Sequence, residues 1–173
     1  MPRHIALLRG VSPMNCRMPL LQRCLEEAGF SDVKTLLSSG NVAFSTPRSA
    51  TPAALQKRVE KALLDGAGYG FMTVVRPAAH LRRLLDSDPF AGFDLPPGSK
   101  RVITFLREPE AVPDVALPFE WRDARVLARL GGEVLCSYVP GDGAPGFMAL
   151  LERRFGKSIT TRTWETVARC AVA

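Results

Sequence analysis

The first half of the chain alternates between short apolar runs and stretches in which apolar residues recur at helical spacing. A strand is predicted at 4–9, because Ile5 to Leu8 form a continuous apolar run with polar residues on both sides. A helix is predicted next, with Pro19 in its first turn and Gly29 as its left-handed end. Its apolar stripe consists of Leu21, Cys24, Leu25 and Ala28.

Two strands, a helix and a further strand are predicted to complete this half. Its predicted elements are a strand at 32–37, a turn at 38–41, a strand at 41–45, a helix from Thr51 to Gly66 and a strand at 71–76. Thr51 and Pro52 suit a helix start, and Gly40 and Asn41 accept the positive φ of a tight turn. The order β-α-β-β-α-β is that of the ferredoxin-like unit.

The second half repeats this order less clearly, after a helix at 77–86 and a stretch rich in Pro and Gly at 88–100. The predicted elements are a strand at 101–107, a short helix within 109–117 that Pro113 interrupts, strands at 121–130 and 133–139 around Gly131–Gly132, a helix from Phe147 to Gly156, a strand at 158–162 and a last helix capped by Thr163. No residue-level repeat connects the halves.

The predicted fold class is therefore α+β, with two successive ferredoxin-like lobes packed as one compact unit. We expect the first lobe at 1–87, a linker at 88–100 and the second lobe at 101–173. A chain of 173 residues is long enough to bury its own core. The hydrophobic fraction of 46% and charged fraction of 23% exclude a disordered or fibrous chain.

The net charge of +6 raises the question of a polyanionic partner. Eighteen of the 23 basic residues are arginines, but they are dispersed along the chain and the local pairs have acidic neighbours. Dispersed charge is typical of a solvated, mildly basic surface, and a nucleic-acid footprint remains the alternative. An RNA-reading sheet would present aromatic rings from its central strands, and Phe44, Phe105 and Tyr138 are too few for that.

Familiar catalytic and metal-binding patterns do not occur in the sequence. Its four cysteines form no C-x-x-C pair and its only histidines are His4 and His80, which we expect at the surface, so neither a zinc site nor a cofactor is predicted. Cys24 and Cys136 lie in apolar patterns that favour buried, reduced thiols. Without a signal peptide or an apolar run of membrane-spanning length, a cytoplasmic protein is expected.

Topology indicates one candidate site. The first strand of a ferredoxin-like unit ends beside its β-hairpin turn, so the loop 9–17 and the turn 38–41 should share one end of the first lobe with the start of the helix near Met18. The polar residues there, Arg9, Ser12, Asn15, Ser39 and Asn41, are expected to surround a phosphate or carboxylate. The alternative is that Ser and Asn only cap helices and fill turns.

Four segments resemble the bacterial family known as domain of unknown function 1697. They are I-A-L-L-R-G at 5–10, L-x-x-x-G-F-x-D-V-K-T at 25–35, S-S-G-N-V-x-F at 38–44 and T-T-R-T-W-E-T-V at 160–167. The resemblance implies a cytoplasmic α+β protein and no particular activity. Arg9, Gly10, Ser39, Gly40, Asn41, Arg162 and Trp164 stand at matching positions.

The sequence departs from the family pattern at 11–15 and 141–148. Members tend to have a polar, glycine-rich stretch at the first place and N-G with a Ser-Lys pair at the second. The leading hypothesis is a small anionic ligand held by Arg9, with hydrogen bonds from Ser39 and Asn41 and close backbone approach at Gly10 and Gly40. Arg162 would contribute only if the second lobe folds over that end. The competing classes are a nucleic-acid or protein interaction module and an enzyme acting on a phosphorylated metabolite, for which no base is identifiable.

Overall fold

The computed structural model describes residues 1–141 and 146–173 and divides the chain into two compact units. The first unit comprises Met1–Arg83 together with Ala168–Ala173, and the second comprises Leu84–Val167. The boundaries drawn from the sequence were 1–87, 88–100 and 101–173. Relative to them, the Pro/Gly stretch at 88–100 lies inside the second unit, and the last six residues belong to the first.

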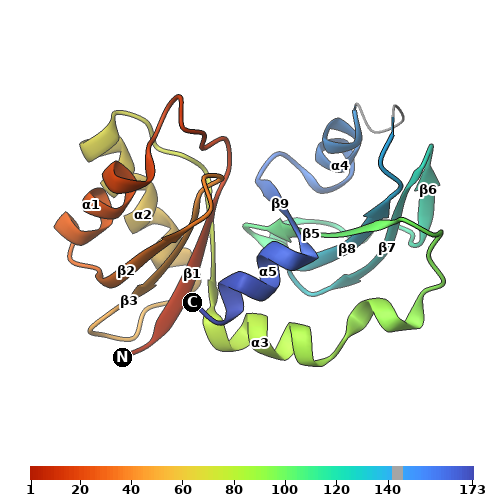
Figure 1. Ribbon diagram of the computed structural model, residues 1–173, viewed down its shortest axis with the longest axis horizontal. Helices are drawn as coiled ribbons and strands as arrows, with labels where there is room; N and C mark the ends of the chain where they lie inside the picture. The colour runs from red at the N-terminus through yellow and green to blue at the C-terminus, as the bar shows by residue number, and fades with distance from the viewer. Residues whose placement is uncertain (142–145) are drawn as a thin grey trace. The chain divides into compact units, whose positions relative to one another are not determined.

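The first unit contains a four-stranded antiparallel sheet in the order β2-β3-β1-β4 (Figure 1). Its strands are β1 (Arg3–Leu8), β2 (Ser31–Leu36), β3 (Asn41–Ser45) and β4 (Thr73–Pro77), with helices α1 (Met18–Glu27) and α2 (Pro52–Ala67) on one face. β1 is central, since Ile5 pairs with Ala43 on one side and with Arg76 on the other. The predicted order of six elements in this half is confirmed.

The core of the first unit lies between this sheet and its two helices. Ala6, Leu8, Val42, Phe44 and Val75 face the apolar stripes of the helices, because alternate residues of a strand point to the same face. The helices contribute Leu21, Cys24, Leu25, Leu55, Val59 and Leu63. Each fully buried large aliphatic side chain stabilises the fold by about 1.5–3 kcal/mol, so this face fixes the strand register.

The two ends of α2 test the predicted caps. Thr51 caps α2 as expected, with its Oγ1 accepting from the backbone N–H of Ala54 at 3.1 Å. The predicted end at Gly66 is wrong, because α2 continues to Ala67 and Gly68, at φ +81°, is its cap. Gly66 instead faces α1, where an added Cβ would lie 2.6 Å from Sγ of Cys24. The glycine is needed for close helix packing.

The second unit contains a five-stranded antiparallel sheet in the order β6-β7-β8-β5-β9. Its strands are β5 (Lys100–Leu106), β6 (Phe119–Trp121), β7 (Ala124–Leu130), β8 (Glu133–Tyr138) and β9 (Ile159–Thr163). Helix α4 (Phe147–Phe155) covers one face through Phe147, Leu150, Leu151 and Phe155. Positions 142–145 of the altered 141–148 segment lie outside the described residues.

Two predictions in this unit are wrong. The expected helix within 109–117 is reduced to the 3-10 turn η2 (Pro109–Ala111), since Pro113 cannot donate the hydrogen bond that a continuing helix needs. The expected strand 121–130 is two strands, β6 and β7, separated by a turn in which Arg122 has φ 54°. The edge strand β6 therefore follows the segment in which the helix was predicted.

The remaining helices are α3 (Ala78–Asp86), η1 (Pro89–Gly92) and α5 (Trp164–Ala171). Thr163 caps α5 as predicted, accepting from the N–H of Thr166 at 3.2 Å. The stretch predicted as a linker has a packed core residue, because Phe90 of η1 is buried and its ring meets the Trp164 ring edge-on at 5.1 Å. In the parts of the chain that the structure describes, no helix is long and apolar enough to span a membrane.

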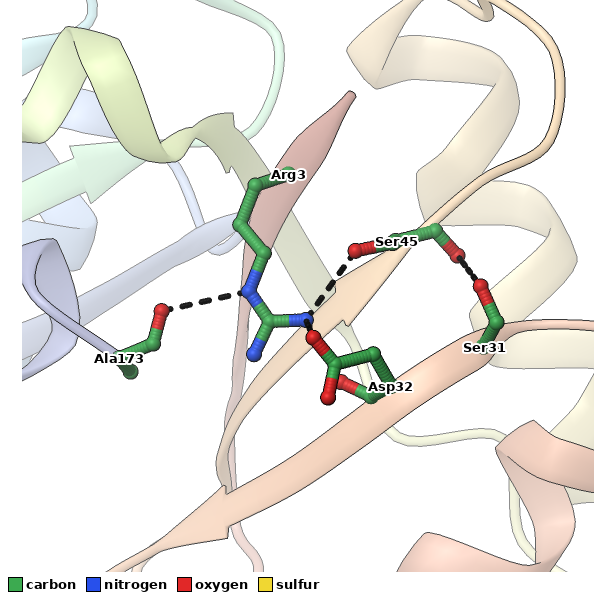
Figure 2. A network of polar contacts seen from close by, with 5 residues as sticks. All are labelled: Arg3, Ser31, Asp32, Ser45 and Ala173. Carbon is green, nitrogen blue, oxygen red and sulfur yellow. Dashed lines mark hydrogen bonds and ion pairs between the residues drawn. The ribbon is translucent and has the colours of Figure 1, made fainter. Parts of the chain in front are cut away.

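A polar network joins the C-terminal residues to the first sheet (Figure 2). Nε of Arg3 donates to the carbonyl oxygen of Ala173 at 3.2 Å, and its Nη1 donates to Oγ of Ser45 at 3.2 Å. The same Nη1 lies 3.1 Å from Oδ2 of Asp32 and donates to its carbonyl oxygen at 2.6 Å. One guanidinium therefore holds β2, β3 and the last residue together.

Candidate functional site

The end of β1 and the β2–β3 turn meet at one end of the first unit. The backbone N–H of Leu8 donates to the carbonyl of Gly40 at 2.9 Å, and that of Arg9 donates to the carbonyl of Met72, just before β4, at 2.9 Å. The sequence predicted this meeting of the loop 9–17 with the turn 38–41 from topology alone. We call this region the loop end of the first unit.

Gly40 is required at the loop end for two reasons. Its φ of +85° is unfavourable for other residues, and an added Cβ would lie 2.9 Å from Cβ of Val11 and 3.1 Å from Cβ of Leu8. Gly10 has a similar φ of +83° but no atom within 4 Å of an added Cβ. Gly40 thus serves close packing between the two loops, whereas Gly10 is exposed.

The polar side chains of the loop 9–17 hydrogen-bond to the loop itself. Oδ1 of Asn15 accepts from the N–H of Ser12 at 2.9 Å, and its Nδ2 donates to the carbonyl of Gly10 at 2.7 Å. Oγ of Ser12 accepts from the N–H of Met14 at 3.2 Å. These contacts match the turn-filling alternative, in which Ser and Asn shape the loop.

Asn41 also has a structural use. Its side chain is fully buried, and Nδ2 donates to the carbonyl of Leu36 at 3.0 Å and to Oγ of Ser39 at 3.1 Å. These bonds hold a turn in which Leu37 takes the unfavourable φ of +59°. Ser39 is exposed beside them.

The charge of the loop end comes from arginines. The loop 9–17 contains two arginines and no Asp or Glu, and Arg9 is half-buried at the end of β1. Arg17, exposed directly before α1, belongs to the same loop, and the sequence reasoning did not select it. The absence of acidic residues over this segment was the signal that would have found it.

Arg162 and Trp164, the other two residues selected from the sequence, lie in the second unit. Nη1 of Arg162 donates to Oγ1 of Thr160 at 2.7 Å and to the carbonyl of Thr161 at 2.9 Å. Trp164 is buried against Phe90. Both side chains therefore have packing partners within their own unit, and a contribution of Arg162 to the loop end stays a prediction.

Of the buried titratable groups with shifted pKa values, only Cys16 belongs to the loop 9–17, and His4, Cys24 and Cys136 lie outside it. The expectation that His4 is at the surface is wrong: it is 5% exposed and its ring stacks on Phe44, with the centroids 5.8 Å apart. Burial lowers the pKa of His4, and a hydrogen bond to the backbone of Pro2 opposes this in part. Burial raises the pKa of Cys136 to about 12, and also raises the pKa values of Cys16 and Cys24.

The four cysteines are buried and no disulfide joins them. Within residues 1–141 and 146–173, no group of three or more His, Cys, Asp or Glu side chains is arranged to hold a metal ion.

Comparison with known proteins identifies the family. The chain belongs to the family described as Protein of unknown function (DUF1697), whose model matches residues 1–133. It is also similar to the conserved bacterial protein SP0830 from Streptococcus pneumoniae, with 18% identity and a TM-score of 0.71 over 99% of this chain and 97% of that one. This likeness establishes the α+β fold alone. No curated protein matches the sequence.

Proposed function

We propose that this DUF1697 protein binds a small ligand bearing a phosphate or carboxylate at the loop end of its first unit. The observation that carries the proposal is the charge of the loop 9–17, which contains two arginines and no Asp or Glu. Such a local surplus of positive charge favours an anion.

The backbone at the loop end supports close approach by such a ligand. Gly10 is exposed, and an added Cβ there would meet nothing within 4 Å, so the chain is accessible at this point. The internal hydrogen bonds of Ser12 and Asn15 hold the loop in one shape, which lowers the entropy cost of binding. In this proposal Arg9 and Arg17 supply charge, and Ser12, Asn15 and Asn41 position the backbone.

We also infer that both units are ferredoxin-like. The sheet order β2-β3-β1-β4 with two helices on one face supports this for the first unit. The order β7-β8-β5-β9 supports it for the second unit. Between β5 and β7 along the chain, where a ferredoxin-like unit has a helix, this unit has the edge strand β6. The buried thiols, none in a disulfide, support the expected reducing, cytoplasmic location.

Calorimetry and thermal shift test the proposed site. Inorganic phosphate and sugar phosphates are titrated at two salt concentrations into the native protein, Arg9→Ala, Arg17→Ala and the control Arg48→Ala. Arg48 is exposed and follows β3, so it lies at the opposite end of that strand from the turn 38–41. We expect binding that survives added salt and is weakened about tenfold by either loop-end variant but not by the control. Equal weakening by all three variants, or no binding, would overturn the proposal.

A second candidate function is recognition of a macromolecule, either a protein or a nucleic acid. Met14 and Tyr69, on the loops around the same end, are 94% and 64% exposed, which favours a protein over a phosphate chain as the partner. Short DNA and RNA in the same titrations separate these possibilities. A shift seen only with oligonucleotides and abolished by salt would indicate a polyanion site.

A further inference from the structure

The second unit has a hollow of about 380 Å³ at the β6–β7 edge of its sheet. It lies between these strands and the segment that follows η1, and two smaller hollows of about 290 and 260 Å³ adjoin it. Arg125 of β7 lines all three. The volume of the largest hollow is within the range of small-molecule sites.

One side of the hollow is apolar. Phe93 and Phe119 are partly exposed and face the space, while Leu127, 5% exposed, lines it from β7. Pro118 completes this wall. A side chain of the size of Leu or Phe that enters here would be partly removed from water, which favours its binding.

The other side carries both signs of charge. Nε and Nη2 of Arg125 each lie 3.0 Å from Oε1 of Glu120, and Nη1 donates to the backbone carbonyl of Asp94 at 2.9 Å. These contacts fix the guanidinium without using all of its N–H groups. Among the described residues, neither Oε2 of Glu120 nor the exposed carboxylate of Asp94 has a hydrogen-bond or ion-pair partner.

We infer that this hollow binds a small zwitterion with a large apolar side chain, that is, a free amino acid of the Leu or Phe class. The ligand carboxylate accepts from the remaining N–H groups of Arg125. The ligand ammonium donates to Glu120 and Asp94, and the side chain occupies the wall of Phe93, Phe119 and Leu127. A ligand with one charge uses either the remaining N–H groups of Arg125 or the remaining carboxylate oxygens, but not both, so the hollow favours a ligand with both charges.

Three probes test the charge requirement by calorimetry on the full chain. They are L-phenylalanine, phenethylamine, which lacks the carboxylate, and 3-phenylpropionate, which lacks the amine. We expect L-phenylalanine to bind about tenfold or more tighter than either of the others, because each lost charged hydrogen bond costs about that factor. Equal binding of a singly charged probe, or no binding by any of the three, overturns the inference.

Two charge-neutralising variants sharpen this test. Arg125→Gln should abolish the preference for L-phenylalanine over phenethylamine, and Glu120→Gln should reduce the preference over 3-phenylpropionate, because Asp94 remains. The matched control is Arg129→Gln, since Arg129 is on the same strand and ties another loop through the carbonyls of Pro109 and Val112 at 2.7 and 2.9 Å. The control should bind L-phenylalanine as the native protein does. If it loses affinity as Arg125→Gln does, the effect is one of general stability and the inference is wrong.

Discussion

Replacing Gly40 by Ala tests how the loop end of the first unit is built. Two costs add at this position. An Ala with φ near +85° loses about 1–2 kcal/mol relative to Gly. The added Cβ would also lie 2.9 Å from Cβ of Val11 and 3.1 Å from Cβ of Leu8, and relieving such a contact costs about 1–3 kcal/mol more. We expect the free energy of unfolding to fall by about 3 kcal/mol.

Gly10→Ala is the matched control, because it separates the two costs. Gly10 has nearly the same φ, +83°, but no atom within 4 Å of an added Cβ, so only the backbone cost of about 1–2 kcal/mol applies. Urea unfolding of both variants, followed by circular dichroism, measures the difference. Equal losses of stability would refute the steric argument, and a larger loss for Gly10→Ala would show that the two loops do not pack as described.

Three further outcomes are expected. The pKa of His4 is lowered in the folded state, so below about pH 6.5 the unfolded chain is protonated first, and the free energy of unfolding falls by up to about 1.4 kcal/mol for each unit by which the pH falls. Urea midpoints measured from pH 8 to 5 should show this slope, and His4→Leu should reduce it. Cys136, with a pKa of about 12, should react with a disulfide reagent at pH 8 only after unfolding, and fast labelling of the native protein would contradict its burial. Arg3→Ala should lower stability by only about 1 kcal/mol, because the side chain of Asp32 is 77% exposed. Releasing the Ala173 carbonyl should also loosen the bond from the Ala173 N–H to the carbonyl of Cys170, so hydrogen exchange at Ala173 should accelerate; unchanged exchange would contradict the contact in Figure 2.

The sequence predicted the first unit well because its signals are local. The run from Ile5 to Leu8, the stripe from Leu21 to Leu25 and the cap at Thr51 each determine an element with little help from the rest of the chain. Topology then predicted that the end of the first strand meets the turn 38–41, which the backbone hydrogen bond from Leu8 to Gly40 confirms.

The errors arose where tertiary contacts decide. A glycine after an apolar stripe predicts the end of a helix, but whether Gly66 ends its helix or packs against Cys24 depends on the neighbouring helix. His4 at the start of a strand gave no sign of its stacking on Phe44. Ser12 and Asn15 suit a ligand site and a self-contained turn equally well, because the same donors and acceptors serve both.

The first unit is built from two separate segments of the chain, and this has a consequence for its synthesis on the ribosome. Its last six residues, Ala168–Ala173, are translated only after the whole of the second unit, Leu84–Val167. The second unit has its complete sequence available earlier, although it begins later in the chain. The first unit cannot form the contact between Arg3 and Ala173 until Ala173 has left the exit tunnel. Cotranslational folding therefore cannot proceed here in simple order from the N-terminus, and the unit that starts first is completed last.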